Sequence, residues 1–142
     1  MMALGRKLES AVRVQGMAKP NPRVEEAKER REREDLAPGL LAEVPYLKSL
    51  RIEFFEERGG RRLGAFARPV VLAHAAAFLE VPCGDEQCRY GGHQLTSDLM
   101  QNVKARVAHF SGSDPCRGDA GSVPCSRVLH YSAKATYTQD VD

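Results

Sequence analysis

Four cysteines, Cys83, Cys88, Cys116 and Cys125, are the residues of this 142-residue chain whose type and spacing best support chemistry. They form two local pairs, spaced C-x4-C and C-x8-C, and each pair lies in a stretch rich in Gly, Asp and Ser. Four thiolates make a complete ligand set for a tetrahedral, structural zinc ion. If folding brings the two pairs together, the sequence predicts one Zn²⁺ site per chain.

The residues around the cysteines fit this role. Three of the four cysteines directly follow a proline, which fixes φ and sets a rigid entry into a turn. Flanking glycines leave backbone amides free to donate to a thiolate sulfur, which orients the ligand. In this arrangement roughly the last 60 residues resemble the zinc-ribbon and treble-clef families, in which two cysteine loops from separate hairpins share a zinc ion. The spacings here are wider than the common C-x2-C knuckle.

Other interpretations of the same residues stay open. His93 follows Cys88 at C-x4-H, so its imidazole is a possible substitute for one thiolate. His130 follows Cys125 at the same spacing, but it falls in an expected strand. In an oxidising compartment the four cysteines would instead form two disulfides, either within each pair or crossed. Reactive thiol chemistry is a further alternative, although the spacing is not C-x-x-C.

The elements expected around the cysteine loops make an α+β domain, mostly antiparallel sheet with one packed amphipathic helix. Leu50, Ile52 and Phe54 alternate with outward-facing neighbours, which predicts a half-buried strand. Arg58-Gly59-Gly60-Arg61 predicts a hairpin turn after it. We expect further strands over residues 69–73, 77–81 and 127–138, and a strand that begins at 109–111 and ends at 114–116. We also expect a helix over residues 97–108 with Thr96 as its N-cap.

The N-terminal third differs from this pattern. Residues 1–22 are predicted to be a flexible extension, within which Met17 is an alternative start to Met1. Residues 23–45 are predicted to form a charged helical arm, because acids precede bases by four positions and little apolar surface is present. Residues 46–142 then form the α+β domain with its zinc-ribbon-like pair of cysteine loops.

Composition narrows the classes of function. The chain has 21 basic and 19 acidic residues, so it lacks the basic excess usual in proteins that neutralise nucleic-acid phosphates. No apolar run approaches the about 20 residues that span a bilayer, and no secretory signal is recognisable. We therefore expect a cytoplasmic protein without membrane contact. No Walker loop, G-x-S-x-G or H-E-x-x-H motif indicates a small-molecule substrate.

Together these patterns predict a small zinc-stabilised, non-enzymatic module that recognises a macromolecule, and we expect that macromolecule to be another protein. The first alternative is an RNA-binding or ribosome-associated protein that uses Arg58, Arg61 and Arg62. The second is a thiol- or metal-dependent enzyme. A catalytic zinc would need an open coordination position and a nearby general base, for which Glu86 is a candidate.

Overall fold

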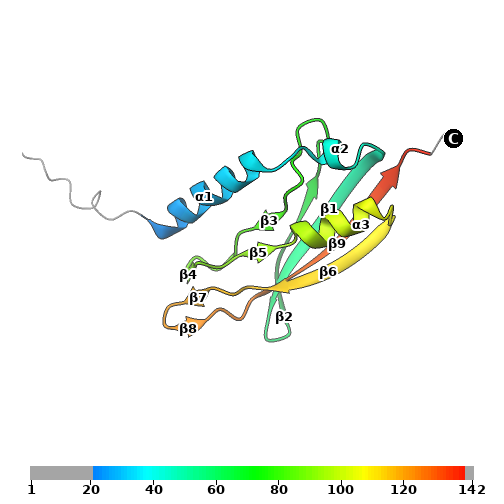
Figure 1. Cartoon of the computed structure of the whole chain (residues 1–142). Coiled ribbons are helices and arrows are strands. Elements are labelled where there is room, and N and C mark those ends of the chain that lie inside the picture. The colour runs from blue at the N-terminus through cyan, green and yellow to red at the C-terminus, as the bar shows by residue number, and fades with distance from the viewer. Residues whose placement is uncertain (1–20, 140–142) are drawn as a thin grey trace, which may run out of the picture.

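A four-stranded antiparallel sheet organises the computed structural model, which describes residues 21–139. Its strand order is β2-β1-β9-β6. The strands are β1 (Leu47–Arg58), β2 (Arg61–Pro69), β6 (His109–Pro115) and β9 (Val128–Tyr137). β9 comes after the other three in the chain, yet it lies between β1 and β6 and pairs with both (Figure 1).

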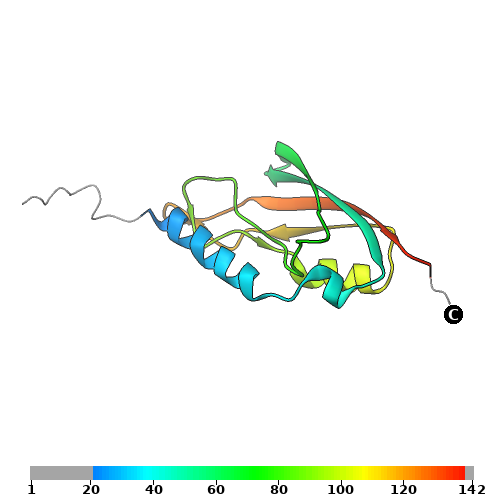
Figure 2. The ribbon, with the colours of Figure 1, turned by 90° about the horizontal axis from the view of Figure 1, so that it is seen from above.

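The helices lie on one side of this sheet (Figure 2). They are α1 (Pro22–Leu36), α2 (Leu40–Glu43) and α3 (Thr96–Lys104). The core lies between the sheet and the two helices α2 and α3. Its members include Leu40, Val44, Leu50, Ile52, Phe54, Leu99, Val103, Leu129 and Tyr131. Each large apolar side chain stabilises the fold by about 1.5–3 kcal/mol when it is fully buried.

The cysteine end of the molecule is built from strands of only two residues each. β3 (Glu80–Val81) pairs with β5 (His93–Gln94), and the three strands β4 (Cys88–Arg89), β7 (Asp119–Ala120) and β8 (Val123–Pro124) form a small sheet in the order β4-β7-β8. Strands this short make few hydrogen bonds and bury few side chains, so they do not hold their own shape. This end needs another source of stability.

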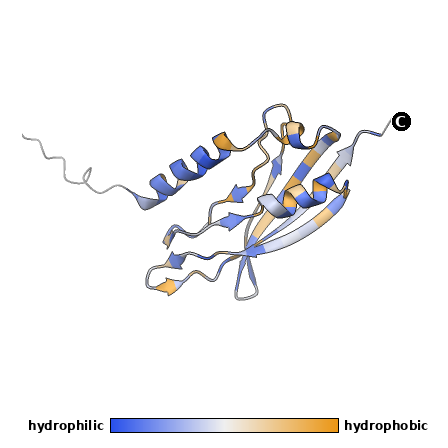
Figure 3. Ribbon diagram, viewed as in Figure 1, coloured by the Kyte–Doolittle hydropathy of each residue, from blue (hydrophilic) through white to orange (hydrophobic). Residues whose placement is uncertain are grey.

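α1 buries none of its side chains and is hydrophilic along nearly its whole length (Figure 3). Asn21 caps it by accepting a hydrogen bond from the backbone N–H of Arg23, and Pro22 occupies the first turn. Two arginines join the helix to the rest of the molecule. Arg33 forms an ion pair of 2.6 Å with Glu80, and Arg23 donates to the Cys83 carbonyl oxygen at 2.7 Å. Polar contacts therefore hold α1 in place.

The hairpin turn between β1 and β2 is confirmed. Arg58 and Arg61 are register partners, and the two glycines between them have φ values of 57° and 79°. A two-residue turn with positive φ at both central positions matches the twist of the flanking strands. Glycine adopts this conformation without the steric penalty that a Cβ would bring.

Three element predictions are corrected. The strand expected over residues 69–73 is wrong, because β2 ends at Pro69 and the described residues 70–79 form turns with one isolated bridge, Gly39 to Ala76. The strand expected over 77–81 shrinks to the two residues of β3. α3 starts at Thr96 and is shorter than expected. The hydroxyl of Thr96 does not cap the helix, since it accepts a hydrogen bond from the backbone N–H of Leu79.

The fold class of a mixed α+β protein with a mostly antiparallel sheet is confirmed. None of the helices within residues 21–139 combines the length and apolar character that crossing a membrane requires. The predicted flexible extension, with its choice between Met1 and Met17 as the start, falls almost entirely outside the described residues. The division into a helical arm at 23–45 and a domain from residue 46 stays a prediction.

Candidate metal centre

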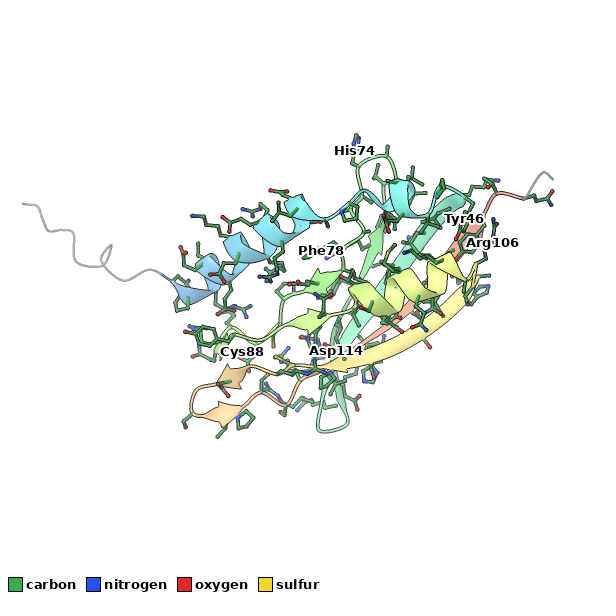
Figure 4. All side chains as sticks on the ribbon, in the orientation of Figure 1. Tyr46, His74, Phe78, Cys88, Arg106 and Asp114 are labelled. Carbon is green, nitrogen blue, oxygen red and sulfur yellow. The ribbon has the colours of Figure 1, made fainter. Side chains whose placement is uncertain are left out.

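The four cysteines converge at one end of the sheet, where Cys88 marks their position in Figure 4. All four residues are buried, and their four Sγ atoms lie within 4.8 Å of one another. The closest pairs are Cys88–Cys116, 3.5 Å apart, and Cys83–Cys125, 3.7 Å apart. In a tetrahedron with Zn–S bonds of about 2.3 Å, neighbouring sulfurs are about 3.8 Å apart. The quartet could therefore bind one metal ion.

The cysteines are free thiols in this structure. A disulfide needs its sulfurs at about 2.05 Å, which is much shorter than either close contact. Each close pair also joins one residue of the first loop to one residue of the second. The arrangement is therefore that of one shared cluster, and the local disulfide pairing considered from the spacing does not describe it.

Two glycines allow the loops to approach the sulfurs closely. A Cβ added to Gly91 would lie 2.5 Å from the Cys116 sulfur and 2.6 Å from the Cys88 sulfur. A Cβ added to Gly118 would lie 2.7 Å from the Cys88 sulfur and 2.5 Å from the Arg89 carbonyl oxygen. Because these contacts involve buried sulfurs and backbone, no side chain fits at either position without moving the cluster.

Backbone amides point at two of the sulfurs, as the flanking turns predict. The N–H of Asp85 donates to the Cys83 sulfur at 3.5 Å, and the N–H of Gly92 donates to the Cys116 sulfur at 3.3 Å. Such hydrogen bonds favour the thiolate form and fix the direction of the sulfur. They are the contacts expected around a cysteine that serves as a metal ligand.

The thiols differ in their pKa. Burial raises the pKa of Cys83 to about 12, even though the Asp85 N–H acts in the opposite direction. Burial also raises the pKa of Cys88. At Cys125 burial acts in the same upward direction, but hydrogen bonds from the Arg127 backbone and the neighbouring thiols lower its pKa overall. A divalent cation would supply the positive charge that allows all four groups to be thiolates together.

A buried carboxylate, Glu56, joins the cysteine loops to the central sheet. Burial alone would raise its pKa, but hydrogen bonds from His93, from the Gly84 N–H and from Arg127 lower that pKa to about 2. The Gly84 amide lies 3.0 Å and the Arg127 guanidinium 2.7 Å from the carboxylate. Since Gly84 follows Cys83 directly, Glu56 fixes the loop that carries the first cysteine.

His93 lies beside the Cys83 sulfur. Its Nδ1 lies 2.9 Å from the Asp114 carbonyl oxygen and its Nε2 lies 3.1 Å from the Glu56 carboxylate. Both partners are acceptors, so a ring nitrogen that carries a proton donates to the acceptor that it faces. Glu56, Cys83 and His93 also form a close group, with ligand atoms within 4.8 Å of one another. The role of His93 as a substitute ligand stays a prediction, and its position is that of a support for the loops.

The three arginines considered for nucleic acid have different neighbours, and their role in binding stays a prediction. Arg58 pairs with Asp85 of the first cysteine loop at 2.7 Å. Arg61 is exposed at the hairpin, whereas the Arg62 guanidinium lies 4.1 Å from the centre of the Phe55 ring. Arg58 therefore supports the cysteine end, and Arg62 belongs to the open face of the sheet.

Sequence reasoning missed Glu56, Arg127 and Arg23. A signal for Glu56 was present, because it continues the inward-facing series of Ile52 and Phe54 and is 8% exposed. A charged residue on the apolar face of a strand indicates a buried partner. Arg23 gave no such signal, since its contact with the Cys83 carbonyl crosses 60 positions of the chain.

No known protein family, curated protein or solved structure matches this chain. Function is therefore inferred from the geometry of the site. Four cysteine ligands satisfy a tetrahedral ion completely, so the cluster is suited to holding loops together.

Proposed function

We propose that Cys83, Cys88, Cys116 and Cys125 bind one zinc ion in a closed structural site of the zinc-ribbon kind. The observation that carries the proposal is the convergence of four buried sulfurs from two loops within 4.8 Å. Soft thiolate ligands in a tetrahedral set favour zinc among the common divalent ions. Four protein ligands leave no coordination position for a substrate, which favours a structural role over a catalytic one.

The burial of the thiols also favours this role over thiol-dependent catalysis. Catalytic cysteines are partly exposed and have a lowered pKa. Cys83 is 1% exposed and burial raises its pKa to about 12. If a single cysteine of the zinc-loaded protein reacted rapidly with iodoacetamide near neutral pH, the enzymatic alternative would replace the structural one.

The zinc-stabilised end is proposed to present a binding surface to another protein. Tyr90 follows Cys88 by two residues and is 81% exposed. Its backbone has a φ of 60°, which is unusual for a residue with a side chain, and its N–H donates to Glu26 of α1. Val24 and Val123, on α1 and β8, are also exposed. Tyrosines held in fixed positions are common energetic centres of protein interfaces.

The metal is tested on untagged full-length protein. We expect elemental analysis to find one zinc per chain, and four titratable thiols after denaturation with a chelator. Replacement of the zinc by cobalt should give the absorption bands of a tetrahedral thiolate site. Purified protein that contains no metal and takes up none would refute the zinc site.

The binding surface is tested by photo-crosslinking in the natural host. A photoreactive residue at position 90 should give a discrete protein adduct, whereas the same residue at the exposed position 74 should not. The adduct should disappear in Cys125→Ser, because loss of zinc releases the loop. Equal adducts at both positions would remove the case for this surface, and an RNA adduct at position 90 would replace the protein partner by a nucleic acid.

A further inference from the structure

The sheet face turned away from the helices carries a stack of flat side chains from three neighbouring strands. The Arg62 guanidinium of β2 lies 4.1 Å from the centre of the Phe55 ring of β1. Phe55 in turn stacks on His130 of β9, with 4.8 Å between ring centres and an angle of 15° between the rings. Neighbouring strands are about 4.7–4.9 Å apart, so each strand contributes one layer of the stack.

β6, the fourth strand of the sheet, contributes no flat side chain to the stack beside His130. β6 places Ser113 opposite His130 in the strand register, and Ser111 opposite Ser132. These small side chains lie in a hollow of about 690 Å³ that His130 and Phe55 also line. Among residues 21–139, Phe55 is the one side chain stacked on the His130 ring. A flat ring above Ser113 would therefore continue the stack from Arg62 across all four strands.

His130 is held in the orientation that such stacking needs. Its Nε2 lies 2.5 Å from a carboxylate oxygen of Glu57, the next outward-facing residue after Phe55 on β1. One face of the ring is covered by Phe55, and the ring plane is fixed by Glu57. A planar ligand would thus meet a preformed surface, which reduces the entropy lost on binding.

The polar groups of the hollow indicate the chemistry of that ligand. Ser111, Ser113, Ser132 and Glu53 are among the residues that line it, beside aromatic and small apolar residues. A hydrocarbon ring would remove these groups from water without replacing their hydrogen bonds, which is unfavourable. A nucleobase has a flat ring and also donors and acceptors along its edge. The lining therefore favours a nucleobase over the phenyl ring of a partner protein.

Cations lie at both ends of the hollow. On β9, Lys134 lies on the same face as the lining residue Ser132 and two positions beyond it, and Arg62 lines the hollow from β2. Within the described part of the chain, Lys134 takes part in no ion pair. Phosphates attached to a bound base would find positive charge on either side.

The acidic residues of this face already have partners. Glu57 contacts His130 at 2.5 Å, and Glu53 lies 3.7 Å from Arg51. Their charges are thus partly offset, and the exposed Lys134 and Arg62 remain available to an anionic ligand.

We propose that the open face of the sheet binds a nucleobase, stacked on His130 above Ser113 and presented by a single-stranded nucleic acid. Aromatic platforms on sheets bind single strands through such stacking with little dependence on sequence. This site uses none of the cysteines, so it stands apart from the metal centre and from the proposed protein surface.

The test measures fluorescence anisotropy of labelled ten-nucleotide RNAs with the zinc-loaded full chain at low salt. We expect weak binding with similar affinity for different bases. The logarithm of affinity should fall only slightly with the logarithm of salt, by about 0.7 per contacted phosphate. His130→Ala should raise the dissociation constant by about fivefold to a hundredfold, the range found for loss of one base stack.

Ser113→Phe sharpens this test, because it places the chain's own ring in the open layer. We expect it to remove oligonucleotide binding while the protein stays folded, since Ser113 is exposed. Thr136→Phe is the matched control, because Thr136 is exposed on the same face but does not line the hollow. The control should bind as the parent does. Ring-proton signals of His130 should shift upfield when the base binds to the parent protein.

Competition with AMP and UMP identifies the source of the base. If AMP or UMP competes as strongly as an unlabelled oligonucleotide, the site is assigned to free nucleotides. If the mononucleotides compete much more weakly, the site is assigned to a single-stranded nucleic acid. Both results agree with a nucleobase site.

Three results would overturn the proposal. These are no binding of any nucleotide, equal binding by Ser113→Phe and the parent protein, and loss of binding in Arg30→Glu of α1 but not in His130→Ala.

Discussion

The two ends of the molecule are stabilised by different means. At the end covered by α3, every second residue of β1 and β9 is buried, and long strands pack against helices. At the cysteine end the strands have two residues each. There the buried cluster that the described residues form consists of the four cysteines, with Ala120 packed against it. Apolar burial stabilises one end, and the proposed zinc ion would stabilise the other.

Glu56 joins the two ends. It lies in the inward-facing series of β1, but its carboxylate contacts the cysteine loop at Gly84 and the strand entry at Arg127. A sheet can thus extend beyond its apolar core when a cluster of cysteines and a few buried polar contacts replace apolar side-chain packing. Each of these three means of stabilisation can be tested separately.

The largest effect is expected from the cysteines. Cys83→Ser or Cys125→Ser should destabilise the zinc-loaded protein by several kcal/mol, because metal binding and folding are linked. Denaturant unfolding measures the loss, and hydrogen exchange should show that residues 80–94 and 116–126 lose protection first. Ser126→Ala, next to Cys125 but exposed, is the control and should change little. Unchanged melting temperatures in both cysteine variants would contradict the prediction.

The next effect concerns the apolar end. Phe54→Ala should destabilise the protein by about 3–5 kcal/mol, because Phe54 is 2% exposed in the core. Phe55→Ala is a matched control on the opposite face and should cost about 1 kcal/mol. Elemental analysis should still find zinc in the folded fraction of both variants. If Phe54→Ala released the metal before the sheet unfolded, the two ends of the molecule would not be stabilised independently of each other.

Glu56→Gln tests the joint between the ends. The change leaves the half-buried Arg127 without its charged partner, and we expect it to destabilise the protein by about 3 kcal/mol. Glu53→Gln, on the exposed face of the same strand, should have little effect. Urea unfolding curves of both variants measure the difference. Equal stability of the two variants would mean that Glu56 does not stabilise the contact between the cysteine loops and the central sheet.

The smallest effect concerns α1. Arg23→Ala removes the hydrogen bond to the Cys83 carbonyl and should weaken docking of the helix by about 1 kcal/mol. Limited proteolysis with a glutamate-specific protease should then cut α1 several times faster, while the sheet stays protected. Lys28→Ala, on the same helix, should leave the rate unchanged. Equal rates for all three proteins would show that Arg23 does not hold the helix.

Elements with a strong period were predictable from the sequence. The alternation in β1 and β9, the amphipathic face of α3 and the Gly59-Gly60 turn each carry a local signal, and each is present in the structure. The convergence of the cysteine pairs was also predictable, because four thiols in two turns have few other favourable arrangements. Local pattern was sufficient in these cases.

The rest depends on contacts across the chain that no local pattern records. β2 is exposed along nearly its whole length, so it lacks the alternation that would mark its extent. The strands of two residues are too short to have a period at all. Glu56 and Arg127 meet across 71 positions, and only the unusual inward position of Glu56 hinted that it had a partner. Such pairings follow from the topology of the sheet, which the sequence does not state directly.

The central position of β9 has a consequence for the order in which the protein acquires its shape during translation. β1 and β2 can form their hairpin as soon as residue 69 has left the ribosome, but β6 has no neighbour in the sheet until residues 128–137 follow it. Cys125, the last cysteine of the cluster, lies three positions before that strand begins. The nascent chain therefore completes its sheet almost as soon as it completes its set of four sulfurs.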